Sequence, residues 1–468
     1  MNPFQHEIQN QLLSAFRRAV EEVPAYRELC GEQAVRVGQI VDLESFSRLC
    51  PLLTRANTFD RFPIDRLCVG GQPGDLAQVL TSSGHGGSGR FSFGLTGRQQ
   101  VALNEYFIDL AMDGAFQVKS QRTLAVNCLP MGVLFTSQCM TVANTSVRED
   151  MAVALVRAFG EYYDQIILLG DPLFLKRLTD HAEEKSLEWS RYRVNAIIGE
   201  EIFGERYRGY IADRLCIGGG RWVMASLGVA ELGLNLCYET PATIALRQAA
   251  FDNPEFAYDL FGIDPSRMAL PMLYSFNPQR IFVESVTPDA DGYGQMTVSM
   301  LDTGLTIPLM RYQTGDAIRL PDPVKVGETA SRHGIPIPCE LPQTLLALKG
   351  RRGEGLPNGS HVGVYKDALY ADANAAGHFT GAFRLTFSNG RFDMHVQLNR
   401  TGAPPASLEQ SIRRAIPPSV QPDGVSLWAY GQFPFGMGLD YERKFTYYVP
   451  EETASPTLKG KSGLEGQA

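Results

Sequence analysis

The sequence has no cysteine pair at metal-binding spacing and no long apolar run. Its eight cysteines are scattered over 468 residues without a CxxC pair, which disfavours a zinc site and argues against a disulfide scaffold. No stretch of about 18 apolar residues is present, so no membrane-spanning helix is expected. The first residues are polar and amphipathic and lack the apolar segment of a signal peptide. We therefore expect a cytoplasmic protein with reduced thiols and no membrane partner.

Positive charge is also in short supply. Lysine and arginine number 43 against 51 aspartates and glutamates, which gives a formal charge of −8. Non-specific binding of nucleic acid needs a cationic surface, so no nucleic-acid partner is expected. The acidic balance still permits an anionic ligand, because a local loop can bind phosphate through backbone N–H groups.

The chain is long enough for about two to four domains, or for one large domain with a satellite. Short apolar strands alternate with amphipathic helices over residues 76–198, which predicts α/β layers with a mostly parallel sheet. Residues 281–320 alternate like antiparallel strands around Gly/Asp turns. The stretch 345–360 is basic and rich in glycine, as is typical of a hinge. The fold class predicted from this pattern is α/β.

The pattern divides the chain into three parts. We expect a large N-terminal domain of layered α/β sheets over residues 1–349. A small mobile α+β C-terminal domain should follow over 350–450, and residues 451–468 should form a disordered tail. One helix is expected over residues 5–29. Another is expected over residues 97–113, with an apolar face made of Val101, Leu103, Phe107, Leu110 and Met112.

Residues 81–90, Thr-Ser-Ser-Gly-His-Gly-Gly-Ser-Gly-Arg, form a loop rich in glycine and hydroxyl groups. Glycines let backbone N–H groups crowd around an anion. The spacing Gly84-x-Gly86-x-x-Gly89 fits a dinucleotide fingerprint, which must open a helix. Residues 91–94 alternate like a strand instead, and the Lys-Ser/Thr of a P-loop is missing. A phosphate-binding loop between two strands remains, with a flexible surface loop as the alternative.

The loop resembles the SSGTTGxP[KT] element of the adenylate-forming superfamily, especially its phenylacetate–CoA ligase-like branch. Residues 310–316 (MRYQTGD) are similar to the RYRTGD element of that superfamily, and residues 227–231 (LGVAE) stand in the place of its YGxTE. Taken alone, this second stretch is typical of a helix. Residues 199–208 resemble the GAEPW…R segment, and residues 350–354 resemble the GRxDD hinge. In order along the chain, the resemblance extends over nearly all of residues 10–450.

The resemblance implies ATP and Mg²⁺ as cofactors and assigns roles to single residues. Asp316 would accept hydrogen bonds from the ribose, and Glu231 would bind Mg²⁺. Lys444 would approach the substrate carboxylate and the α-phosphate, with Arg90 and His85 as further catalytic groups. The nucleotide-binding set implied by the same motifs is Thr81, Ser82, Ser83, Gly84, Gly86, Gly87, Glu201, Gly228, Asp316 and Arg351.

The substrate implied is a small carboxylic acid, with an aromatic or other planar acid as the first choice. Phe135 and Gly199 would line its pocket, although Phe135 is equally typical of an ordinary core. The acid would be activated to acyl-AMP with release of pyrophosphate. The acyl group would then pass to CoA, to a carrier-protein thiol, to a protein cysteine or to an amine. A homodimer is one of the oligomeric states that the sequence leaves open.

The chain also departs from the pattern of the superfamily. His85 and Gly86 replace the usual Thr pair of the loop, which removes two hydroxyl donors. Leu227 and Ala230 replace an aromatic and a hydroxyl residue, and Gly353 replaces an acidic one. The alternative function is therefore a degenerate member that binds nucleotide or acyl-AMP and acts as a subunit or scaffold in a biosynthetic pathway.

Overall fold

The computed structural model describes residues 3–82, 91–265, 267–351, 355–400, 404–434 and 445–448. Its α-helices are α1 (Pro3–Glu22), α2 (Pro24–Glu32), α3 (Leu43–Leu49), α4 (Ile64–Leu67), α5 (Val101–Phe116), α6 (Glu149–Phe159), α7 (Pro172–Glu184), α8 (Glu205–Arg214), α9 (Pro241–Asp252), α10 (Pro254–Phe261), α11 (Pro323–Arg332), α12 (Val362–Ala368), α13 (Ala373–Ala376) and α14 (Leu408–Ala415). Its strands are β1 (Leu76–Thr81), β2 (Phe93–Gly97), β3 (Thr123–Asn127), β4 (Thr141–Asn144), β5 (Gln165–Gly170), β6 (Val194–Ile198), β7 (Val223–Val229), β8 (Gly233–Tyr238), β9 (Met272–Phe276), β10 (Ile281–Val286), β11 (Gly294–Met300), β12 (Tyr312–Arg319), β13 (Leu346–Arg351), β14 (Phe379–Ser388), β15 (Arg391–Leu398) and β16 (Gly424–Trp428).

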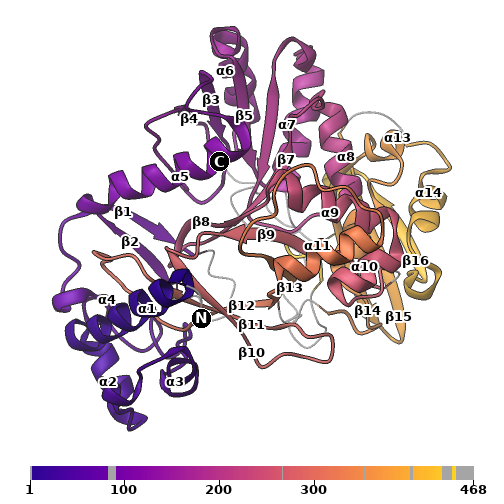
Figure 1. The fold of residues 1–468 in the computed structure, drawn as a ribbon. Coiled ribbons are helices and arrows are strands. Elements are labelled where there is room, and N and C mark those ends of the chain that lie inside the picture. Colours follow the sequence, from indigo (N-terminus) through magenta and orange to yellow (C-terminus); the bar gives the residue numbers. More distant parts are fainter. Residues whose placement is uncertain are drawn as a thin grey trace, which may run out of the picture.

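A large mixed sheet runs through the middle of the molecule (Figure 1). Its strand order is β10-β11-β12-β13-β9-β8-β7-β6-β5-β3-β4. The strands from β4 to β7 are parallel, and helices α6, α7 and α8 connect them in sequence. From β7 onward every pair is antiparallel. The mostly parallel sheet expected over residues 76–198 is thus confirmed for β3 to β6, and the antiparallel strands expected over residues 281–320 are confirmed as β10, β11 and β12.

Two smaller sheets lie outside the large one. Strands β1 and β2 form an antiparallel hairpin, and β14, β15 and β16 form a mixed sheet near the C-terminus. Strand β14 of the second sheet contacts α7, and Figure 1 shows that sheet at the right of the molecule, next to α14. The α+β composition expected for residues 350–450 agrees with the helices and strands from α12 to β16. Alternation is clear in β15, where Phe392, Met394 and Val396 are buried, whereas the first seven residues of β14 are all buried.

The apolar core is continuous across residue 350. One cluster of buried side chains contains residues of α1, the parallel strands and the C-terminal elements. The ring of Tyr370 packs on Tyr207 of α8 at 4.9 Å and on Tyr210 at 5.2 Å. Tyr207 and Tyr370 are buried, and α12 and β14 contact α8 and α7. The expected boundary at residue 350, and the mobility expected for residues 350–450, stay predictions.

Two expected helices differ in detail from the structure. The helix expected over residues 5–29 is two helices, because Pro24 has no N–H to donate and begins α2 at its first position. Helix α5 has the expected period, but its buried face is different. Leu103 and Leu110 are 37% and 42% exposed, while Met112 is 7% exposed. The inner face follows Ile108, Met112 and Ala115, because these side chains line a cavity.

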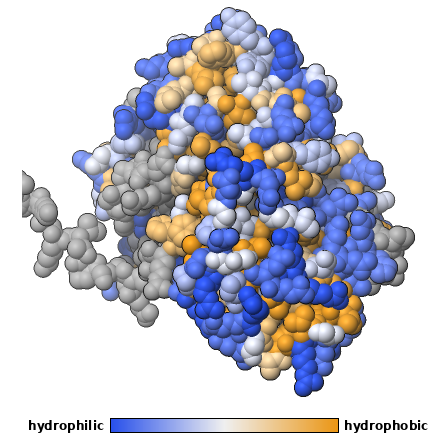
Figure 2. Space-filling model, turned by 90° about the vertical axis from the view of Figure 1, so that its left-hand side faces the viewer, coloured by the Kyte–Doolittle hydropathy of each residue, from blue (hydrophilic) through white to orange (hydrophobic). Residues whose placement is uncertain are grey.

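Apolar side chains also reach the surface on the face that carries the N-terminal elements. Figure 2 views that face and shows hydrophobic patches among charged side chains. Val79 of β1 is 51% exposed and Tyr106 of α5 is 52% exposed. No described helix is long and apolar enough to cross a membrane. The homodimer and the disordered tail of residues 451–468, which lie outside the described residues, remain predictions.

Candidate active site

The base of the glycine-rich loop is a closed β-hairpin. Thr81 pairs with Phe93, and the Ser82 N–H donates to the Ser92 carbonyl at 3.0 Å. The Ser92 N–H returns a hydrogen bond to Ser82 Oγ at 2.9 Å. The loop is therefore followed by a strand and not by a helix, as expected. The loop residues to which roles were assigned lie outside the described residues: Ser83, Gly84, His85, Gly86, Gly87 and Arg90.

The β7–β8 hairpin packs directly against this base. Residues 230–232 form the turn between the two strands, so the stretch around Glu231 is not the helix that its sequence suggests. A Cβ on Gly94 would lie 1.9 Å from the Ala230 carbonyl oxygen, so only glycine allows this approach. Glu231 is consequently held next to the strand that leaves the glycine-rich loop.

Strand β12 supplies a third segment to the same place. The buried Tyr312 hydroxyl donates to Glu231 Oε1 at 2.6 Å and also interacts with the Ser92 side chain. Burial raises the pKa of Tyr312 well above its usual range, and the neighbouring Glu231 carboxylate raises it further. Tyr312 is thus a neutral donor that joins Glu231 to the loop base. The motif containing Tyr312 was recognised in the sequence, but this contact was not.

Asp316 and Arg351 lie opposite each other on β12 and β13. Thr314 Oγ1 donates to Asp316 Oδ2 at 2.7 Å, and Arg351 Nε is 3.8 Å from Asp316 Oδ1. Gly315, between Thr314 and Asp316 in the chain, has φ +88°, a backbone conformation that favours glycine. Asp316 is only 7% exposed, and its Arg351 partner is at the limit of an ion pair. The structure therefore brings together two of the residues assigned to the nucleotide.

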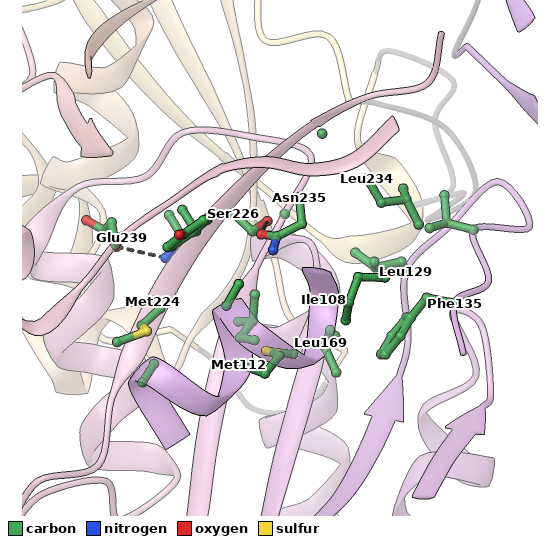
Figure 3. A pocket seen from close by; sticks show the side chains of 18 of the residues that line it. Ile108, Met112, Leu129, Phe135, Leu169, Met224, Ser226, Leu234, Asn235 and Glu239 are labelled. Carbon is green, nitrogen blue, oxygen red and sulfur yellow. Dashed lines mark hydrogen bonds between the residues drawn. The ribbon is translucent and has the colours of Figure 1, made fainter. Parts of the chain in front are cut away.

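An apolar cavity of about 100 Å³ lies beside the hairpin (Figure 3). Phe135, Gly199 and Gly228 are among its lining residues, as are Glu200 and Glu239. Its other walls are mostly aliphatic or thioether side chains, including Ile108, Met112, Leu129, Leu169, Ile197, Met224 and Leu234. An apolar cavity of roughly 150 Å³ holds a benzene ring in another protein. The cavity is therefore of the size and polarity that suit a small acyl group.

The Glu239 carboxylate in this wall is already neutralised. Arg208 donates to Glu239 Oε1 at 2.7 Å and to Oε2 at 2.9 Å, and the Ala225 N–H donates at 2.7 Å. Arg208 also pairs with Glu205, which contacts Arg247. All four charged side chains are buried. The network makes the Glu239 side of the cavity rigid and electrically balanced.

Comparison with known proteins gives a match in structure alone. No protein-family model matches the chain, and no curated protein sequence does. 2-Hydroxyisobutyryl-CoA ligase, solved in the postadenylation state in complex with R3-HIB-AMP, is 14% identical. The match covers 96% of this chain and 90% of that one, with a TM-score of 0.64.

Two further structures of that ligase match with lower scores. The open conformation with 2-HIB-AMP and CoA is 14% identical over 96% of this chain and 91% of that one, with a TM-score of 0.53. The thioesterification state with CoA is 15% identical over 95% and 89%, with a TM-score of 0.52. The chain has the fold of the acid–CoA ligases of the adenylate-forming superfamily. The resemblance inferred from sequence motifs is confirmed at the level of this fold.

Within the adenylate-forming fold, the C-terminal elements hold Glu201. Lys366 Nζ of α12 lies 2.7 Å from Glu201 Oε2, and Tyr447 Oη donates to the same oxygen at 3.2 Å. Lys366 also lies over the Tyr447 ring at 4.1 Å. Glu201, which was assigned to the cofactor, thus contacts residues from the far end of the chain. Lys444 lies outside the described residues, three positions before Tyr447.

Asp171 is a further acid of this chain, with a buried carboxyl oxygen, that the sequence did not single out. It follows β5 and caps α7, where its Oδ1 accepts the Phe174 N–H at 3.0 Å. Its Oδ2 is buried without a partner among the described residues. Burial raises the pKa of Asp171 to about 7, and the carboxylates of Glu201 and Glu200 raise it too. Only an Asp-Pro pair after a strand was visible in the sequence, which indicates a helix cap.

Proposed function

We propose that the chain is an ATP-dependent ligase that activates a small carboxylic acid to acyl-AMP. The observation that carries this proposal is the position of the β7–β8 hairpin. Gly228 of this hairpin lines the apolar cavity, and Glu231 at its turn is hydrogen-bonded by Tyr312. The same turn packs on the strand that follows the glycine-rich loop. An acid in the cavity and a triphosphate at the loop would therefore meet at one hairpin.

The residues present fit Mg²⁺ bound together with a nucleotide. Among the described residues, no group of three or more His, Cys, Asp or Glu side chains could hold a metal ion. Mg²⁺ in nucleotide sites is usually held by one or two carboxylates, waters and the phosphates, which matches a single glutamate. Glu231 Oε1 is oriented by Tyr312, and its Oε2 has no partner among the described residues. Bound there, the ion would offset phosphate charge.

The remaining roles follow the sequence assignments. Asp316 would exchange its loose Arg351 contact for the ribose hydroxyls, since a carboxylate accepts two hydrogen bonds from a vicinal diol. The loop amides and Arg90 would hold the β- and γ-phosphates. One oxygen of the substrate carboxylate attacks the α-phosphorus, and the bond from that phosphorus to the pyrophosphate oxygen breaks. Lys444 would neutralise charge during this displacement.

A thiol, with CoA as the first choice, is the proposed acceptor for the second step. The thiol sulfur would attack the acyl carbon, and AMP would leave with the former carboxylate oxygen. Support comes from the bound CoA in two structures of 2-hydroxyisobutyryl-CoA ligase. The higher TM-score against the postadenylation state of that enzyme supports an arrangement of this chain suited to the first step.

The test is acid-dependent release of pyrophosphate over a panel of aryl and alkyl acids. Asp316→Ala should abolish turnover, and Lys444→Ala should slow it strongly. The exposed residues Asp252 and Lys325 provide matched controls, and their alanine variants should behave like the unmodified protein. Absence of nucleotide binding in calorimetry at millimolar ATP and Mg²⁺ would refute both the ligase and a degenerate nucleotide-binding role.

A further inference from the structure

Asn235, in the wall of the apolar cavity, has hydrogen-bonding capacity that the described residues do not use up. Of the polar groups in its wall, Glu239 is fully engaged by Arg208 and the Ala225 N–H. Ser226 Oγ donates to Asn235 Oδ1 at 2.8 Å. This bond uses the acceptor of the Asn235 carboxamide and leaves its Nδ2. No partner for Nδ2 is found among the described residues, although a primary amide carries two N–H donors.

The position of Asn235 directs those donors toward a ligand. In Figure 3 the Asn235 side chain lies toward the middle of the lining residues, near Ser226 and above Met112. Asn235 faces Gly228 across the β7–β8 hairpin, where a Cβ on Gly228 would lie 3.6 Å from the Asn235 nitrogen. It is thus four residues from Glu231 and inside the acyl cavity. A donor in apolar surroundings costs free energy unless the bound molecule supplies an acceptor.

We infer that Asn235 is a specificity-determining residue that selects acids carrying a hydrogen-bond acceptor on the acyl group. This inference rests on the proposed function, since it takes the cavity as the acyl site. The bond from Ser226 orients the carboxamide so that Nδ2, and not Oδ1, meets the substrate. A hydroxyl, alkoxy or keto group on the acid would accept from it. A methyl group of similar volume would leave the donor unpaired, and an amino group would place donor against donor.

The backbone conformation at position 235 is a second reason for an asparagine there. This conformation determines which variants can be tested. Asn235 has φ +54°, a left-handed conformation that asparagine, aspartate and glycine tolerate best. Asn235→Gly therefore keeps the backbone and removes the amide. Asn235→Asp keeps the acceptor for Ser226 and removes the donors. A purely conformational role predicts that both variants keep the substrate preference, whereas the inferred role predicts that both lose it.

The experiment compares matched acids with a hydroxyl, a methyl or an amino group at the same position. Benzoates substituted at positions 2, 3 and 4 form one set, and butyrates substituted at positions 2 and 3 form another. The readouts are kcat/KM for pyrophosphate release and calorimetric binding of each acid alone. At one position or more, the hydroxy acid should exceed its methyl and amino counterparts by at least about tenfold, because the unpaired donor penalises them. In Asn235→Gly and Asn235→Asp the ratio should fall to about twofold or less.

Leu234→Ala is the matched control in the same wall. It enlarges the cavity without touching the carboxamide, so it should change the affinity for all three acids of a set in parallel. Equal use of the three acids by the unmodified protein overturns the inference. A preference for the amino-substituted acid overturns it too, as does a preference for the hydroxy acid that persists in Asn235→Gly. Pyrophosphate release without discrimination retains the proposed function and refutes only the role of Asn235. Binding that discriminates among the acids without pyrophosphate release retains the role of Asn235 and refutes the proposed function. The absence of both binding and turnover refutes the proposed function and the role of Asn235 together.

Discussion

The hydroxyl of Tyr312 is the atom whose removal tests the assembled site most directly. Tyr312→Phe deletes one oxygen and leaves the ring, which is buried and packs edge-on against Phe59 at 6.4 Å. The hydroxyl is the donor to Glu231 Oε1 and interacts with Ser92 at the base of the glycine-rich loop. The substitution therefore separates three segments that are distant in sequence, without creating a cavity larger than the lost oxygen.

The magnitude follows from the type of hydrogen bond. A hydrogen bond to a charged group contributes about 1.5–3 kcal/mol, and Glu231 is partly exposed, so water replaces part of the loss. We expect the free energy of unfolding to fall by about 1–2 kcal/mol. The Glu231 carboxylate also loses the hydrogen bond that orients it toward the proposed Mg²⁺ position. A further loss of about 1.4 kcal/mol in transition-state binding corresponds to a roughly tenfold lower kcat/KM for MgATP.

The assays are urea denaturation and pyrophosphate release at varied MgATP. Tyr210→Phe is the matched control, because the Tyr210 hydroxyl is buried without a partner among the described residues. That variant should be as stable as the unmodified protein, or slightly more stable, with unchanged activity. The reasoning is refuted if Tyr312→Phe keeps both stability and kcat/KM, or if Tyr210→Phe loses as much as Tyr312→Phe.

Three further predictions concern charged groups around the site. Because burial raises the pKa of Asp171 to about 7, the folded protein binds more protons than the unfolded chain between about pH 4 and 7. Its stability contribution is thus present at low pH and lost as pH rises through 7. Asp171→Asn should reduce the fall in unfolding free energy between pH 5 and 8 by about 2 kcal/mol, and an unchanged pH profile would contradict this. For the Lys366–Glu201 pair, the double-mutant cycle of Lys366→Met and Glu201→Gln in urea denaturation should give a coupling of about 1 kcal/mol or more; additive effects would show that the contact contributes nothing. Arg208→Met leaves Glu239 buried without its cation and Glu205 with Arg247 alone, and should cost about 3–5 kcal/mol, measured as a lower denaturation midpoint; a loss below about 1 kcal/mol would refute the proposed role of the network.

Local pattern was enough to predict much of the fold. The strand after the glycine-rich loop was expected from the alternation in residues 91–94, and β2 begins there. Pro24 divides the first helix because a missing N–H is a local property that overrides the apolar period. Such features depend on a few neighbouring residues, so they can be predicted from a single sequence.

The errors arise where tertiary contacts decide. The stretch around Glu231 has helix-forming residues, but β7 and β8 pair with β6 and β9 and so extend the sheet. The buried face of α5 was placed wrongly because the helix covers a cavity and not a flat sheet. The Tyr312–Glu231 bond joins residues 81 positions apart, and the Lys366–Glu201 pair joins residues 165 positions apart. No local period indicates either contact.

Under the proposed function, the β7–β8 hairpin places acid and nucleotide recognition in one unit of the chain. Ser226, Gly228 and Asn235 line the cavity, and Glu231 at the turn contacts β12. Glu239 at the far end is fixed by Arg208 to α8, which also packs on the C-terminal elements. A shift of the hairpin would therefore move the cavity wall and the carboxylate proposed to hold the metal together. The buried ion pairs at one end and the Gly94 contact at the other hold the hairpin at two points, which makes it a rigid support for the proposed reaction and not a flexible loop.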